Sequence, residues 1–348
     1  MGIIKEIFLG LIPELTGEER EELLAELVAA IDNELVVRVT GDGDGGQAVC
    51  PRCGCPHTHR KGRPNGRQRH LCEGCGRSFS ASTNRVMALS KLPREAWVEF
   101  ARCMMDMLPL RRCAERCGVG LKTAFFMRHR VCECMEGYLD PFRVGPSCSA
   151  EIDELYLRES LKGNHKKGGR FKMPRKAKRR PGDGVRGGTT DDLVCILTGI
   201  NDRGACFLEV CGMGRFTSDD ARRMLASKVS EGAIVSTDDH HAYKKALHEI
   251  GVAVHNHYRA NDRGQGVINA VNSLHARLRG FLDVFRGISS RWLGSYLAWF
   301  KWLESFRMRS SSERMEKAVA HTANGFYKTR IRDCWDRPYQ FEIYGVVY

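Results

Sequence analysis

The sequence lacks several features that would direct it to a membrane or to nucleotide-driven chemistry. None of its apolar runs approaches the roughly 18 residues that a bilayer span requires. The apolar stretch at residues 1–11 is broken by Lys5 and Glu6, and no small-residue cleavage site follows it, which argues against an export signal. No Gly-x4-Gly-Lys-Ser/Thr sequence occurs, so ATP-driven chemistry has no support. We therefore expect a cytoplasmic, multidomain protein that is not inserted in a membrane.

Acidic residues are nearly absent between positions 161 and 190. This basic insert has eleven lysines and arginines and one acid, Asp183, so it carries most of the formal net charge of +13. A patch this dense favours a polyanion partner, and nucleic acid before a membrane, because no apolar helical face accompanies it. A solvated basic loop is the alternative. The candidate DNA contacts here are Lys166, Lys167, Lys176, Lys178, Arg179 and Arg180.

The chain has 15 cysteines. In a cytosol, spaced cysteine pairs bind metal more often than they form disulfides. Two C-x2-C pairs occur, Cys50 with Cys53 and Cys72 with Cys75. Four thiolates complete a tetrahedral zinc site that has no open position for catalysis. We therefore predict one structural Zn²⁺ in a DNA-contacting zinc ribbon at residues 46–85. Its candidate DNA contacts include Arg67 and Arg69.

Residues 90–140 have a helical pattern. Apolar residues recur at intervals of three and four between Pro93 and Pro109. A short second helix then ends at Gly118, and a basic third helix begins near Leu121. This order predicts a helix-turn-helix whose last helix can enter the DNA major groove, whereas a plain helical linker is the alternative. The candidate contacts are Thr123, Arg128 and Arg130.

The next segment, residues 148–305, alternates between strand and helix patterns. We predict strands at 149–157, 193–200, 206–211, 233–237 and 252–255, and helices at 218–229, 242–250 and 267–282. Three strands followed by alternating helices and strands is the order of an RNase H-like sheet. The predicted fold is therefore multidomain α+β, with a helical segment at 1–45, the zinc ribbon, the helix-turn-helix and an RNase H-like α/β catalytic domain.

The two ends of the chain are less informative. Residues 17–31 predict an amphipathic helix suited to dimerisation or domain packing. Residues 306–348 are aromatic and basic, and we assign them no role.

Two aspartates occupy positions that are typical of a metal-dependent site. Asp153 lies inside the first predicted strand of this domain, where a half-buried carboxylate is costly unless it binds a metal or a partner. Asp238 follows the apolar run 233–235, at the strand end where α/β sheets place their sites. Carboxylates on adjacent strands can hold two divalent ions that activate a nucleophile and stabilise the leaving oxygen of a phosphodiester. Each aspartate taken alone is more simply a loop or cap residue.

Three polar residues share one face of the predicted helix 267–282. His275 and Arg279 lie three and seven residues after Asn272, so all three point the same way from the helix. An amide or an imidazole can complete a Mg²⁺ site, and a guanidinium can hold a phosphate. Helical periodicity alone favours a row of solvent-exposed polar side chains over a metal or phosphate site.

Several strings resemble one family. They are residues 152–156 with 159–163, 236–238 with 242–243, 271–280, and 286–290 with 296–300. In order, together with the predicted ribbon and helical module, they resemble the transposases of bacterial and archaeal insertion sequences of the ISXO type. The resemblance implies an RNase H-like domain with two Mg²⁺ or Mn²⁺ ions. It also implies cleavage and strand transfer on double-stranded DNA at the terminal inverted repeats and at target DNA, by a homodimer or higher homo-oligomer.

Carried over by position, the resemblance makes Asp153 and Asp238 the catalytic aspartates. The third position in this family is Glu, Asn or His, with a basic residue downstream. Asn272 or His275 can fill it here, with Arg279 in place of the more usual lysine. Glu154 is expected to point to the opposite face of its strand. Because the third acid is absent, a domesticated, non-catalytic DNA-binding regulator is the alternative function.

Overall fold

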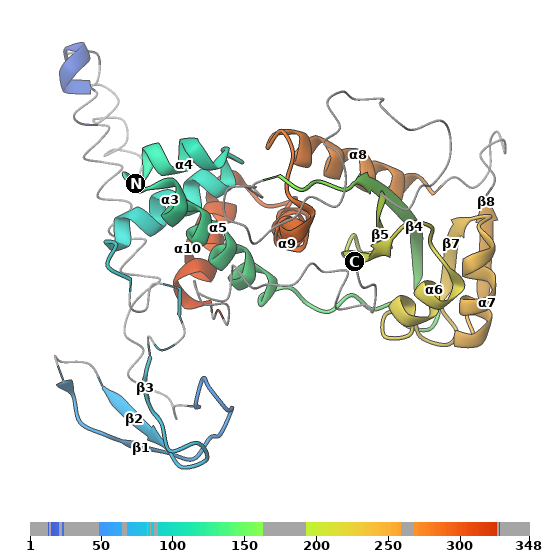
Figure 1. Cartoon of the computed structure of the whole chain (residues 1–348), viewed down its shortest axis with the longest axis horizontal. Coiled ribbons are helices and arrows are strands. Elements are labelled where there is room, and N and C mark those ends of the chain that lie inside the picture. The colour runs from blue at the N-terminus through green and yellow to red at the C-terminus, as the bar shows by residue number, and fades with distance from the viewer. Residues whose placement is uncertain are drawn as a thin grey trace, which may run out of the picture. The chain divides into compact units, whose positions relative to one another are not determined.

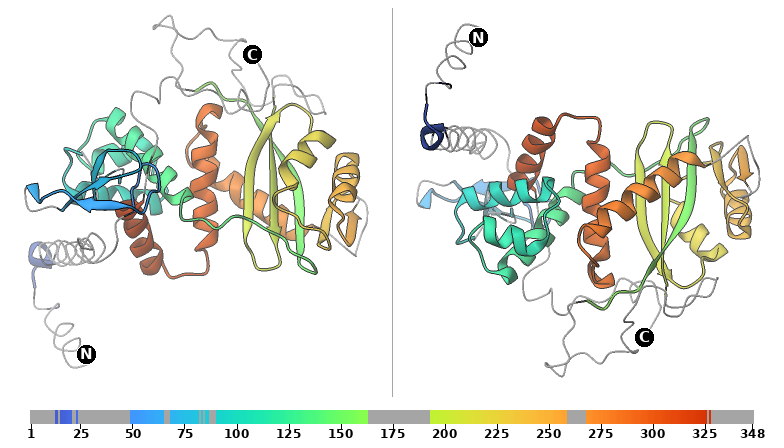
Figure 2. Two further views of the ribbon diagram at one scale, coloured as in Figure 1. Left: turned by 90° about the horizontal axis from the view of Figure 1, so that it is seen from below. Right: turned by 90° about the horizontal axis from the view of Figure 1, so that it is seen from above.

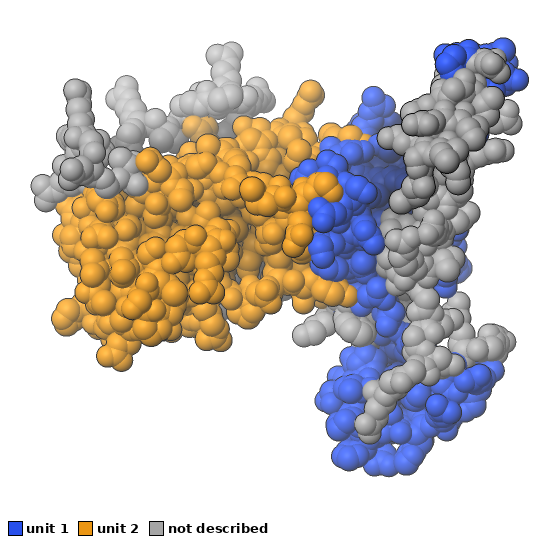
Figure 3. Space-filling model, turned by 180° about the vertical axis from the view of Figure 1, so that it is seen from behind, with its two compact units in different colours: residues 1–106, 111–127, 311–327 blue, residues 107–110, 128–310, 328–348 orange. Residues whose placement is uncertain are grey.

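The computed structural model describes residues 13, 15–20, 23, 49–64, 68–81, 83, 85–86, 90–162, 193–258, 268–325 and 327. It divides into two compact units, coloured in Figure 3: unit 1 comprises residues 1–106, 111–127 and 311–327, and unit 2 comprises 107–110, 128–310 and 328–348. Of the helix predicted at 17–31, residues 17–20 and 23 are helical and the rest lie outside the described residues. Almost all of the basic insert, from residue 163 onward, also lies outside them.

The segment with the two C-x2-C pairs forms a small antiparallel sheet in unit 1. Its strands are β1 (Thr58–Arg60), β2 (Arg69–Cys72) and β3 (Ser78–Ser80), with β2 in the centre. Gly54 and Gly76 follow the second cysteine of each pair with φ of 74° and 66°, a conformation that favours glycine. The buried centre of this sheet is Cys50, Cys72 and Phe79, with Cys55 and Cys75 packed against it.

Four helices complete the described part of unit 1. They are α3 (Arg94–Met105), α4 (Leu110–Arg116), the start of α5 (Leu121–Glu136), and α10 (Ser311–Asn324). Val98 and Ala101 of α3 pack against Val319 of α10, so the segment to which the sequence assigned no role supplies part of this core. Gly118, with φ of 59°, lies in the turn between α4 and α5. None of the described helices is long and apolar enough to cross a bilayer.

Unit 2 contains a five-stranded mixed sheet. The strands are β4 (Ser149–Arg158), β5 (Leu193–Asn201), β6 (Cys206–Met213), β7 (Ile234–Asp238) and β8 (Val254–Tyr258), in the order β6-β5-β4-β7-β8. β4, β5 and β6 are mutually antiparallel, whereas β7 runs parallel to β4 and β8 runs parallel to β7. The predicted order of strands and helices is confirmed. β8 lies two to three residues later than expected.

Helices cover both faces of this sheet (Figures 1 and 2). On one face, α6 (Ser218–Leu225) and α7 (His241–Ile250) share a core with the sheet that includes Ile152 and Val235. The other face carries α8 (Asn269–Asp283), the short 3-10 helix η4 (Ser290–Trp292) and α9 (Leu293–Ser305). α6 is shorter than the predicted 218–229 because Val229 leaves the helix to pair with Val144.

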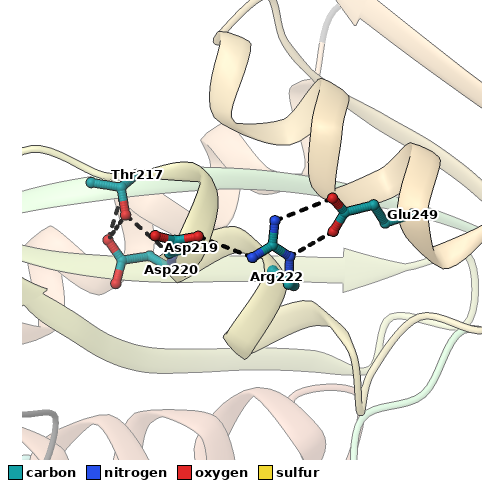
Figure 4. Close-up of polar contacts among 5 residues, drawn as sticks. All are labelled: Thr217, Asp219, Asp220, Arg222 and Glu249. Atoms are coloured by element: carbon teal, nitrogen blue, oxygen red, sulfur yellow. Dashed lines mark hydrogen bonds and ion pairs between the residues drawn. The ribbon is translucent and has the colours of Figure 1, made fainter.

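The ends of α6 are held by polar contacts on the surface (Figure 4). Thr217 caps its N-terminus in a reciprocal arrangement with Asp220. Arg222 contacts Glu249 of α7 through two hydrogen bonds of 2.6 and 3.1 Å. Exposed pairs of this kind contribute little to stability, at most about 1 kcal/mol.

Candidate functional site

The register of two parallel strands brings Asp153 and Asp238 together. β4 pairs with β7 from Ser149 opposite Ile234 to Glu151 opposite Ser236. Two residues further along each strand are Asp153 and Asp238, which therefore reach the same level of the sheet. Polar groups at the carboxyl end of parallel strands are placed where α/β sheets build their sites.

Backbone amides fix one oxygen of each aspartate. The amide of Glu154 donates to Asp153 Oδ1 at 2.9 Å, and the amide of His240 donates to Asp238 Oδ1 at 3.1 Å. Oxygen atoms of Asp153, Asp238 and Glu154 all lie within 4.8 Å of one another. The three residues therefore form one acidic cluster in which each can offer an oxygen to a shared cation.

Glu154 points to the opposite face of β4 from Asp153, as predicted, but its carboxylate also reaches the acidic cluster. Strand alternation does direct it toward α7, where Tyr243 Oη donates to Glu154 Oε2 at 2.6 Å. Its carboxylate nevertheless belongs to the acidic cluster, since one of its oxygens lies within 4.8 Å of oxygens of Asp153 and Asp238. The sequence contained both partners, but no periodicity rule could predict a contact across 89 residues.

Electrostatics favour a cation at this cluster. Burial, followed by the charges of Glu154 and Asp238, raises the pKa of Asp153 to about 8, although Arg279 acts in the opposite direction. Burial also raises the pKa of Glu154 despite the hydrogen bond from Tyr243. Among the described residues, no lysine or arginine forms an ion pair with the three carboxylates. Oxygen ligands that lack a cationic partner fit a hard divalent ion such as Mg²⁺.

Helix α8 brings a histidine close to Asp153. His275 is 4% exposed, its Nδ1 lies 3.8 Å from Asp153 Oδ2, and its Nε2 lies 2.6 Å from Thr198 Oγ1. Burial, together with the charge of Arg279, lowers the pKa of His275 to about 4, so its ring is neutral. Asn272 and Arg279 lie on the same helix and are exposed.

Residues on and just after β4 hold both ends of α8. Glu151 Oε2 accepts the amide of Val271 in the first turn of the helix at 3.0 Å. Lys162 Nζ donates to the carbonyls that follow the helix, those of Phe285, Arg286 and Gly287, at 3.3, 3.1 and 2.8 Å. A carboxylate at the N-terminus and an ammonium group at the C-terminus both suit the helix dipole.

Two strings that the sequence singled out are also joined directly to each other. The amide of Ser160 donates to Ser290 Oγ, and the amide of Ser290 donates to the carbonyl of Ser160, both at 2.8 Å. Together with Lys162, this pairing ties the segment after β4 to the segment after α8. These contacts fix the position of α8 along β4, and with it the position of His275 beside Asp153.

Substituting Lys162 is expected to loosen the end of α8. Lys162→Ala removes three hydrogen bonds from a charged donor, and we expect a loss of about 1–3 kcal/mol in the free energy of unfolding. Hydrogen exchange should become faster at the amides of residues 283–290. Arg222→Ala, which breaks the exposed α6–α7 pair, is the matched control and should leave those amides unchanged. Unchanged exchange in Lys162→Ala would show that Lys162 does not anchor the helix.

The raised pKa of Asp153 makes a pH dependence measurable in protein that is free of Mg²⁺ and Mn²⁺. Since the folded chain keeps a proton that the unfolded chain has released, the free energy of unfolding should fall as the pH rises toward about 8. Buried histidines with lowered pKa values act in the opposite direction, but below pH 6.5. We therefore expect a negative slope between pH 6.5 and 8 in buffer that lacks Mg²⁺ and Mn²⁺ but leaves bound zinc in place, measured by chemical denaturation. If the Asp153→Asn variant has the same slope, the pH dependence does not arise from Asp153.

The second candidate metal site is in unit 1. Sulfur atoms of Cys50, Cys53, Cys72 and Cys75 lie within 4.8 Å of one another. Cys55 lies beside this set and contacts the carbonyl of His57 at 3.7 Å. Four thiolates at this separation can hold a zinc ion.

One of the predicted DNA contacts is contradicted by its environment. Arg128 is 1% exposed, and its guanidinium packs against the rings of Phe285, Tyr296 and Trp299 at 5.3 to 5.9 Å. Its Nη2 donates to the carbonyl of Leu108 at 2.6 Å. Arg128 is therefore part of the core of unit 2 and cannot contact DNA in this structure.

The other predicted DNA contacts are not contradicted. Thr123 and Arg69 are exposed, and Arg130 is half-buried. The remaining candidates lie outside the described residues: Arg67, Lys166, Lys167, Lys176, Lys178, Arg179 and Arg180.

One known protein family matches part of unit 2. Residues 149–305 match the family described as the ISXO2-like transposase domain. A search of curated proteins found no match. Among solved structures, a chain titled "Crystal structure of a pre-cleavage Mos1 transpososome" matches with 13% identity and a TM-score of 0.26, covering 65% of this chain and 79% of that one. The matched segment contains the acidic cluster and His275, and it resembles an ISXO2-like transposase domain.

Proposed function

We propose that the chain is a DDE-class transposase of an insertion sequence that cuts and joins DNA at the acidic cluster. The observation that carries this proposal is the convergence of Asp153, Asp238 and Glu154, inside the segment that matches a transposase domain, without an ion pair to any lysine or arginine that the structure describes. Two Mg²⁺ or Mn²⁺ ions held there would activate a water or hydroxyl nucleophile and stabilise the leaving oxygen of a phosphodiester.

The chain's own residues take distinct parts in this proposal. Asp153 is the central ligand, because it shares the acidic cluster with Asp238 and Glu154 and also lies beside His275. We assign the third position to His275 rather than Asn272, because His275 Nδ1 faces Asp153 Oδ2 at 3.8 Å whereas Asn272 is exposed. Arg279, which is exposed near Asp153, would hold a DNA phosphate.

The fold assignment is part of the same proposal. The sheet order β6-β5-β4-β7-β8, with three antiparallel strands followed by two parallel ones, supports an RNase H-like domain. In that arrangement the first two catalytic aspartates come from the first and fourth strands, which are β4 and β7 here.

DNA binding is assigned to unit 1 and to the basic insert. The four cysteines would hold one Zn²⁺ that folds a ribbon with exposed Arg60, Lys61, Arg63 and Arg69. Thr123 and Arg130 remain candidate contacts from the helix-turn-helix, and Arg67 and the lysines and arginines of the insert remain candidates from composition. The partner would be double-stranded DNA, at the terminal inverted repeats and at the target. We propose that a homodimer or larger homo-oligomer acts on it in the cytoplasm.

The proposal is tested by strand scission with the purified full-length protein. The substrate is DNA from both flanks of the gene, incubated with Mg²⁺ or Mn²⁺ and, in parallel, with chelator. We expect metal-dependent 3′-hydroxyl ends at discrete positions. Tight, specific binding without a nick in either metal would reject the transposase and favour the non-catalytic regulator.

A further inference from the structure

Thr198 is a buried hydroxyl that contacts both Asp153 and His275. It lies in β5 directly opposite Asp153 of β4 and is fully buried. Its Oγ1 donates to the backbone carbonyl of Asp153 at 2.8 Å and lies 2.6 Å from Nε2 of His275. The two contacts are short enough to be hydrogen bonds at the same time.

The proton count at Thr198 decides which nitrogen of His275 carries hydrogen. A hydroxyl has one proton to donate, and Thr198 uses it on the carbonyl of Asp153. The contact with His275 must therefore run the other way, with Nε2–H of the ring donating to Thr198 Oγ1. In the neutral ring, Nδ1 then carries a free lone pair, and that is the atom that faces Asp153 Oδ2.

This arrangement resembles that of a metal-binding histidine whose other ring nitrogen is held by a hydrogen bond. Histidines that bind metal in proteins usually donate their second ring N–H to a fixed acceptor, which sets the tautomer and the orientation of the ring. Thr198 supplies such an acceptor to His275, and its own orientation is set by the carbonyl of Asp153. One threonine thereby links the backbone of the first catalytic position to the side chain of the third.

We propose that Thr198 is a positioning residue that holds His275 in the Nε2–H tautomer and so directs Nδ1 toward a metal ion shared with Asp153. The metal-binding part of this inference rests on the proposed function, whereas the tautomer itself does not. An equivalent arrangement occurs at the second aspartate. Thr237 Oγ1 donates to the carbonyl of Asp238 at 2.7 Å and lies 2.9 Å from Nε2 of His255.

The tautomer is tested directly by NMR of metal-free, full-length protein labelled with ¹⁵N on histidine. His275→Gln identifies the signals of His275. We expect a protonated Nε2 and an unprotonated Nδ1 in the wild type and in Thr198→Ser, which keeps the hydroxyl. In Thr198→Val the two nitrogen shifts should move toward each other, whereas Thr237→Val should affect His255 instead. A wild-type spectrum with a proton on Nδ1 would overturn the proposal, whether or not any variant folds.

The consequence for metal binding is tested with Mn²⁺ by calorimetry. Thr198→Val should weaken Mn²⁺ binding about 10- to 100-fold, the usual cost of losing such a supporting contact, and Thr198→Ser should restore it to within about twofold. Thr322→Val is the matched control, since Thr322 is equally buried but lies in α10 of unit 1. Wild-type affinity in Thr198→Val would overturn the metal-positioning role. A wild type that neither binds Mn²⁺ nor cuts DNA would instead reject the proposed function, and the NMR result on Thr198 would still stand.

Discussion

Asp153→Asn and Asp238→Asn are each expected to abolish DNA scission and to leave DNA binding intact. Asparagine keeps the size of the side chain but removes the negative charge that a divalent ion requires. The two oxygens that accept backbone amides can still do so, because the amide side chain retains one carbonyl oxygen. We expect a loss of at least about 10³-fold in the cleavage rate, which corresponds to roughly 4 kcal/mol of transition-state stabilisation.

The measurement combines single-turnover scission with fluorescence anisotropy on the same DNA. Asp219→Asn is the matched control, because Asp219 is an exposed acid at the start of α6 that pairs with Arg222 away from the acidic cluster. It should cut at the wild-type rate. Glu154→Gln should reduce the rate less than the aspartate variants do, because its carboxylate is shared with Tyr243. Retained cleavage in both aspartate variants would refute the site.

Removing one cysteine of the Cys50, Cys53, Cys72 and Cys75 set is expected to unfold the small sheet of unit 1. The strands have only three or four residues each, and their buried centre consists of Cys50, Cys72 and Phe79. So small a core cannot offset the entropy of ordering the chain, whereas a structural zinc site contributes about 10–16 kcal/mol. Cys72→Ser should therefore lose bound zinc and the protection of the β1–β3 amides, and should bind DNA more weakly.

The matched control for this prediction is Cys55→Ser. Cys55 packs beside the cluster but is not one of the four converging thiols, so its loss should leave one zinc per chain. Metal content by elemental analysis and hydrogen exchange of residues 49–80 would distinguish the two variants. A full complement of zinc in Cys72→Ser, or its loss in Cys55→Ser, would show that the ligand set is wrong.

Local patterns were sufficient for much of unit 2. β4 and β5 follow the predicted strands to within one residue at each end, because both segments are rich in apolar residues and β5 is a nearly continuous apolar run. The predicted end of α6 was wrong because residues beyond the helix pair with a distant segment. Val229 leaves α6 because Val144 offers it a backbone pairing, and no local pattern indicates that.

Lys162 and Ser160, which hold α8 in place, both lie in a string that resembles the family. The sequence did not show which residues they would contact. Lys162 and Gly287 are 125 residues apart, and Ser160 and Ser290 are 130 apart. Sequence spacing carries no information about pairs so distant unless both lie in one repeating element. The same limit applies to Arg128, where a basic residue on a predicted recognition helix instead packs against aromatic rings of unit 2.

For this chain, residue types and spacings alone indicated the family, the four-cysteine set and the two aspartates, because each depends on short strings or on the end of a single strand. Tertiary structure alone distinguished the two candidates for the third position. Asn272 and His275 share one helix face, and only the packing of α8 against β4 and β5 buries His275 between Asp153 and Thr198. Burial and hydrogen-bond direction depend on the position of α8 relative to the sheet, and contacts between residues far apart in the chain set that position.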